Sequence, residues 1–123
     1  MNSYQDIQTM TLFIGGYFGP NNQVVFNLEK GTYAFSTYTR MSDSYEKKGY
    51  FSASKLLAHL ESCQCLDWDE SYENEGILDG MHWTLEISFK SRESFESGGS
   101  NNYPDSFKTL CGVISRIIKY SFS

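Results

Sequence analysis

The chain has 123 residues, which is enough for one domain with a single hydrophobic core. Fifteen acidic residues outnumber ten Lys and Arg residues, and the net charge of −5 disfavours nucleic acid and anionic membranes as direct partners. Nine Phe, nine Tyr and two Trp residues argue against disorder, so we expect one folded domain over residues 1–123.

The first third of the chain predicts three strands joined by short turns. Residues 9–17 are rich in β-branched and apolar side chains, and the turn sequence Gly-Pro-Asn-Asn follows at residues 19–22. Two further stretches, Val24 to Leu28 and Thr32 to Arg40, predict the second and third strands. Connections this short favour an antiparallel meander. The polar segment Met41 to Tyr50 carries mixed charges and predicts a loop.

Two helices are predicted from the spacing of apolar residues. The first should begin at Ser52, a favourable N-cap residue, and end near Cys63. Its apolar residues recur on one helical face, and they are Ala53, Leu56, Leu57 and Leu60. The second should begin near Pro104, because a proline in the first turn loses no hydrogen bond. Its apolar stripe consists of Phe107, Leu110, Cys111, Ile114, Ile117 and Ile118.

Between the two helices the pattern changes to strict alternation. Apolar and polar residues alternate from Trp83 to Phe89, which predicts a half-buried strand. Residues Glu93 to Ser97 should pair back with it as a hairpin, and residues 98–102 should form a flexible turn. The predicted order is therefore βββ-α-ββ-α. We expect an α+β fold in which one antiparallel sheet of about five strands carries two helices on one face.

The stretch between Leu56 and Phe89 contains eight acidic residues and no Lys or Arg. Acidic residues can attract a basic partner, and the aromatic residues among them can supply rigid contact area. The candidate partner-binding residues are Asp67, Trp68, Asp69, Glu70, Tyr72, Glu73, Glu75 and Asp79. The alternative is a solvated loop in which Trp68 and Tyr72 turn inward to cap the core while the acids face water.

Motifs for catalysis and for metal binding are absent or incomplete. Residues 67–79 form what we call the acidic segment. Asp67, Asp69 and Ser71 have the spacing of the first three ligands of an EF-hand loop, but Tyr72 stands where that loop requires Gly. The pair Cys63 and Cys65 lacks a second set of zinc ligands. Cys111 lies on the apolar stripe of the last helix, where a Cys is usually a small core residue. We therefore expect no catalytic residue, no bound metal, no cofactor and no enzymatic activity.

Three spaced motifs occupy the C-terminal half. They are W-x₃-Y at residues 68–72, D-G-x-x-W-x-L-x-I at residues 79–87 and G-S-N-x-Y-P at residues 99–104. This pattern resembles that of small bacterial immunity proteins, which neutralise contact-dependent or polymorphic toxins. The resemblance implies that the partner is a cognate toxin domain, often a nuclease with a basic cleft. A small acidic protein could occupy such a cleft as a phosphate mimic.

The sequence therefore predicts an immunity protein that binds a basic toxin nuclease and occludes its active site. One alternative is a phage-encoded inhibitor that mimics nucleic acid towards a host nucleic-acid-binding complex. Another is a small hydrolase or ligand-binding protein that uses clustered carboxylates. Exposed aromatic residues of the first strands could also mediate a homodimer. The polar residues 1–9 lack the features of a secretory signal, which favours a cytoplasmic protein.

Overall fold

The computed structural model describes residues 3–16, 20–38, 44–73 and 80–122. Within these residues the protein has an α+β fold, in which seven strands form one mixed sheet that carries two α-helices. The elements in chain order are η1 (Ser3–Asp6), β1 (Ile7–Gly16), β2 (Asn21–Asn27), β3 (Thr32–Tyr38), β4 (Ser44–Tyr50), α1 (Ala53–Ser62), η2 (Cys65–Asp67), β5 (Ser71–Glu73), β6 (Met81–Phe89), β7 (Phe95–Ser100) and α2 (Phe107–Ile118). None of the described helices is long and apolar enough to cross a membrane.

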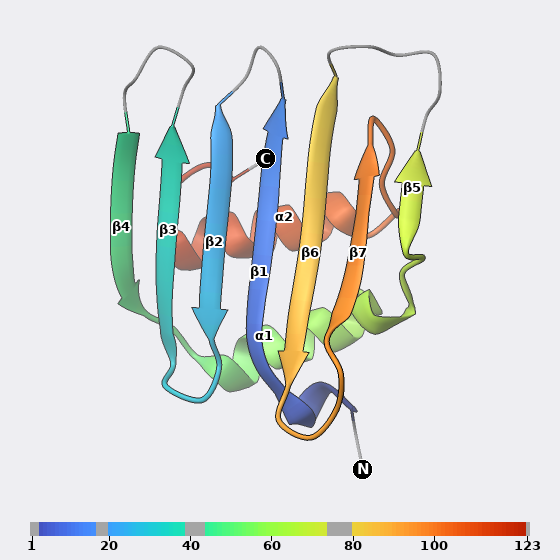
Figure 1. Ribbon diagram of the computed structural model, residues 1–123. Helices are drawn as coiled ribbons and strands as arrows, with labels where there is room; N and C mark the ends of the chain where they lie inside the picture. The colour runs from blue at the N-terminus through green and yellow to red at the C-terminus, as the bar shows by residue number, and fades with distance from the viewer. Residues whose placement is uncertain (1–2, 17–19, 39–43, 74–79, 123) are drawn as a thin grey trace.

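The sheet is built outwards from β1, which pairs antiparallel with β2 on one side and with β6 on the other. The strand order is β4-β3-β2-β1-β6-β7-β5, and both helices lie behind the same face (Figure 1). Strands β1 to β3 form the predicted meander, and β6 and β7 form the predicted hairpin. Because β6 lies beside β1, the two halves of the chain share one sheet and one core.

Side-chain alternation decides which face of the sheet the helices cover. Met10 and Leu12 of β1 lie opposite Ile87 and Leu85 of β6, and all four are buried. The helices contribute their apolar stripes to the same core, with Leu56 and Leu60 from α1 and with Phe107, Leu110, Cys111, Val113, Ile114 and Ile118 from α2. Polar residues dominate the alternate positions of the strands, so the other face of the sheet stays open to solvent.

Both predicted helices are confirmed. Helix α1 begins after Ser52, whose hydroxyl accepts a hydrogen bond from the backbone N–H of Lys55 at 3.4 Å. Helix α2 begins at Phe107 and therefore later than predicted. The carbonyl of Pro104 accepts a hydrogen bond from the Phe107 N–H at 3.0 Å, so the proline belongs to the turn that leads into the helix.

The prediction of a loop from Met41 to Tyr50 is wrong over Ser44–Tyr50. These residues form β4, which pairs antiparallel with β3 along its whole length. None of the seven residues is buried, because β4 is an outer strand and its side chains meet the core only at its margin. Its two large apolar side chains, Tyr45 and Tyr50, lie on opposite faces, so the strand shows no hydrophobic alternation, and only its backbone pairing with β3 defines it.

The sheet also departs from the predicted antiparallel arrangement at its other edge. Strand β5 lies inside the acidic segment and pairs parallel with residues 98–100 of β7, which were predicted to be a turn. A Cβ atom on Gly99 would lie 2.2 Å from the carbonyl oxygen of Tyr72, and one on Gly98 would lie 2.9 Å from that of Trp83. The two glycines therefore allow close backbone approach, which the sequence pattern did not distinguish from a turn.

The three cysteines should be almost unreactive in the folded protein. All three are buried. Burial raises the pKa of Cys63 and of Cys65, and it raises the pKa of Cys111 from 9.0 to about 12. We expect iodoacetamide at about pH 8 to modify the denatured protein quickly and the native protein only as fast as it opens, as mass spectrometry would show. Equal rates in the two states would contradict this packing.

The same thiols predict how stability depends on pH. Their pKa values are higher in the folded chain, and the pKa of Cys111 rises from 9.0 to about 12, so between these two values the unfolded chain binds fewer protons at this thiol. The contribution of Cys111 to the free energy of unfolding should therefore be constant below pH 9 and fall as pH rises from 9 towards 12.

Candidate functional site

The acidic segment begins where α1 ends and runs along the edge of the sheet to β5. Gln64, in the left-handed region with a φ of 54°, turns the chain from the helix into η2. Asp67, Asp69, Glu70 and Glu73 all have exposed side chains. The other two predicted acids, Glu75 and Asp79, lie outside the described residues.

The aromatic residues of the segment turn towards the core. The Trp68 side chain is only 7% exposed, and its indole N–H points at the Cys63 carbonyl and the Ser106 hydroxyl, each at 3.2 Å. Tyr72 is half-buried, with its ring centroid 5.9 Å from that of Trp83. The inward-facing alternative therefore describes Trp68, which is not an exposed anchor. Both rings hold the segment on the core and leave its acids outside.

Hydrogen bonds to the backbone of the segment fix it against β7. The Ser97 hydroxyl donates to the carbonyl of Asp69, and the Gly98 N–H donates to the carbonyl of Glu70 at 3.1 Å. The Asp69 N–H in turn donates to the Tyr72 hydroxyl at 2.9 Å. These bonds place Glu70 at the margin of the open face, next to residues that lie far away in the sequence.

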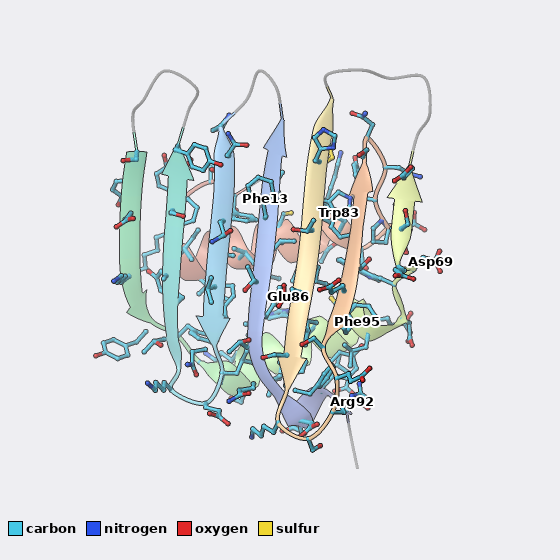
Figure 2. The ribbon with its side chains drawn as sticks, viewed as in Figure 1. Phe13, Asp69, Trp83, Glu86, Arg92 and Phe95 are labelled. Carbon is cyan, nitrogen blue, oxygen red and sulfur yellow. The ribbon has the colours of Figure 1, made fainter. Side chains whose placement is uncertain are left out.

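On the open face these elements enclose a shallow concavity of about 440 Å³. Phe13 of β1 and Thr84 of β6 contribute to its lining, and Glu70, Glu86 and Glu96 bring three carboxylates from three parts of the chain. Figure 2 labels Phe13 and Glu86 on neighbouring strands of the sheet and Asp69 at the margin beside β5. Among its described lining residues there is no Lys or Arg. An aromatic surface bordered by carboxylates is suited to a cationic side chain.

The two strand carboxylates lie in an unfavourable register. Glu86 of β6 and Glu96 of β7 are directly opposite each other in the antiparallel pair. Side chains in this relation lie close enough to interact, and like charges there destabilise the sheet. On the other side of Glu86 its neighbour is Thr11 of β1, which cannot neutralise the charge. The folded protein therefore keeps a repulsive pair on its open face.

Sequence reasoning missed this grouping in part. Glu86 was counted among the eight acids but was not assigned to the site, and Glu96 lies beyond the stretch without Lys and Arg. The alternation of both strands would have placed the two residues on the polar face. Their direct opposition depends on the hairpin register, which the sequence prediction did not specify.

The described residues do not bring several candidate metal ligands together. They contain no group of three or more His, Cys, Asp or Glu side chains that could hold a metal ion. Cys63 and Cys65 are both buried, and burial raises the pKa of each, which disfavours the thiolate form that binds metals. The geometry of the site is suited to ion pairs and hydrogen bonds with a partner.

No protein-family model matches the sequence, and a comparison with curated proteins finds no similar one. What can be inferred about function therefore comes from the residues of this chain and their arrangement.

Proposed function

We propose that this protein is a cytoplasmic immunity protein, which binds a cognate bacterial toxin and blocks its active site. The toxin is a nuclease with a basic cleft. The observation that carries the proposal is the concavity on the open face, where Glu70, Glu86 and Glu96 gather and none of the described lining residues is Lys or Arg. Glu86 and Glu96 repel each other in the free protein, and a cation placed between them would convert that repulsion into attraction.

The chemistry of the concavity agrees with such a partner. A nuclease holds phosphates with Lys and Arg, and the same side chains can form charge-assisted hydrogen bonds with carboxylates. Close charge pairs at interfaces of this kind can be coupled by about 1.5–7 kcal/mol. Asp67, Asp69 and Glu73 are exposed in the same segment as Glu70 and add negative charge there, which would speed the encounter with a basic protein.

The proposed site combines the exposed acids Asp67, Asp69, Glu70 and Glu73 of the acidic segment with Glu86 and Glu96 of the sheet, and it no longer includes Trp68 as an exposed anchor. Trp68 supports the surface from inside, and contact area comes from Phe13 instead. Glu75 and Asp79 remain candidate contacts from the sequence alone. A phage-encoded inhibitor of a host nucleic-acid-binding complex would use the same surface, and the identity of the captured protein would distinguish the two functions.

The proposal is tested by purifying the tagged protein from its native host and identifying the protein bound to it. We expect a toxin domain with an excess of Lys and Arg around its active site. The affinity of the toxin domain for this protein should fall at least about tenfold between low salt and roughly 0.5 M NaCl, because exposed charges are screened. Inhibition of the purified toxin should fall in parallel. An affinity that does not change with salt would contradict a charge-led interface.

A further inference from the structure

Strand β4, with seven residues, forms one outer edge of the described sheet. This strand pairs with β3 on one side, and among the described elements none lies on its other side (Figure 1). An edge of this kind presents unpaired backbone N–H and C=O groups, which can pair with a further strand. Strand β4 is long enough for such pairing, in contrast to the three residues of β5 at the opposite edge.

Exposed tyrosines gather at this edge. Among the described residues the large hydrophobic side chains that are exposed are Tyr38, Tyr45, Tyr50 and Tyr120. Tyr50 is 85% exposed, and Tyr45 stacks on Tyr120 with 5.3 Å between ring centroids. Tyrosine combines a large apolar ring with a polar tip, and it is enriched at protein interfaces for this reason. These exposed tyrosines therefore give the β4 edge side chains of the kind that interfaces use.

The charged residues of β4 can pair with those of a second copy of the same strand. Glu46 and Lys48 pair with Ser36 and Ala34 of β3, so their side chains lie on the same open face. If two β4 strands pair antiparallel around a twofold axis at Lys47, Glu46 of each copy lies opposite Lys48 of the other. This register forms two opposite-charge pairs, and each stabilises a sheet. Among the described residues neither side chain has an ion-pair partner within its own chain.

The remaining positions fit the same register. Tyr45 lies opposite Gly49 of the second copy, over which the ring of Tyr33 lies, and Tyr50 lies opposite the small Ser44. Ser44 is in turn the neighbour of Tyr38 on β3. Lys47 sits on the axis, but its ammonium donates to the carbonyl of Ile118 at 2.7 Å. That bond draws its charge towards its own helix and away from the second Lys47.

We propose that two copies of this protein associate through β4, in this register, to form one continuous sheet across both molecules. The β4 edge and the acidic surface near β5 lie at opposite ends of the strand order. The dimer therefore leaves both acidic surfaces free and directs them away from each other. Dimerisation and partner binding are separate properties, and either can fail without the other.

Sedimentation equilibrium of the purified full-length chain tests the proposal. We expect a concentration-dependent dimer, and we expect Glu46→Lys or Lys48→Glu to weaken it at least about tenfold, because each change creates two like-charge pairs. The double variant Glu46→Lys/Lys48→Glu should restore the dimer. Mixing the two single variants should give a heterodimer tighter than either homodimer, since every opposing pair is then complementary.

The matched control is Glu93→Lys, which changes the net charge by the same two units as Glu46→Lys at an exposed residue between β6 and β7, on the other side of β1 from β4. It should leave dimerisation unchanged, and circular dichroism should show that all variants are folded. A wild-type chain that remains monomeric overturns the proposal, even if a different protein pairs with β4. Single variants that dimerise as strongly as the wild type also overturn it. So does a double variant that fails to recover the dimerisation of the wild type.

Discussion

Replacing Glu70, Glu86 and Glu96 together by Gln should weaken binding of the toxin by about 10²–10³-fold, through the loss of charge pairs. Gln keeps nearly the size of Glu and still accepts hydrogen bonds, so the shape of the concavity around Phe13 is retained. For contacts that become buried in the complex, the lower affinity should come mostly from a faster dissociation rate. Isothermal titration calorimetry or surface plasmon resonance against the captured toxin measures it.

The same substitution should make the free protein slightly more stable. Glu86 and Glu96 oppose each other in the sheet, and removing their repulsion should raise the free energy of unfolding by roughly 0.5 kcal/mol. A gain in stability together with a loss of binding would show that the repulsion serves a function. A gain in stability with unchanged binding would show an ordinary solvated surface and would contradict the proposed site.

A matched control separates local from overall charge. The variant Glu29→Gln/Glu93→Gln/Asp105→Asn changes the net charge by the same three units, and its acids are exposed outside the concavity. It should weaken binding only through long-range steering, by a factor of a few, and this effect should vanish at high salt. If the control loses as much affinity as the Gln variant, net charge and not the concavity governs recognition.

The largest loss of stability is expected for Trp83→Ala, at about 3–5 kcal/mol. Trp83 is 1% exposed, and its ring packs against those of Phe107, Trp68 and Tyr72 at centroid distances of 4.8, 5.7 and 5.9 Å. Its indole N–H also donates to the Asn102 carbonyl at 2.7 Å. The variant therefore leaves a cavity and removes a hydrogen bond, and urea unfolding followed by circular dichroism measures the change.

This effect has consequences for the acidic segment. Trp68 and Tyr72 hold that segment through their contacts with Trp83, so the variant should also speed hydrogen exchange around β5. The control is Thr84→Ala on the same strand, because Thr84 is exposed on the opposite face and should change stability by less than about 0.5 kcal/mol. Similar stabilities for the two variants would contradict the packing around Trp83.

The elements that the sequence predicted correctly carry a local pattern. The apolar stripe of α2 and the alternation from Trp83 to Phe89 each report burial of one face, and both are read from neighbouring residues alone. Strand β4 was missed because neither of its faces is buried, and β5 was missed because three residues are too few for a pattern. The glycines of β7 were misinterpreted because close packing and turns require the same residue.

By itself the sequence determined the α+β class, both helices and the buried face of β6. It also determined that the stretch between Leu56 and Phe89 carries eight acidic residues and no Lys or Arg. Only the tertiary structure decided that Trp68 lies inside and that Glu70, Glu86 and Glu96 share one surface. Periodicity along a chain specifies which face a side chain takes. Which residue lies beside it on that face depends on strand order and register, and these are set by pairing between segments distant in sequence.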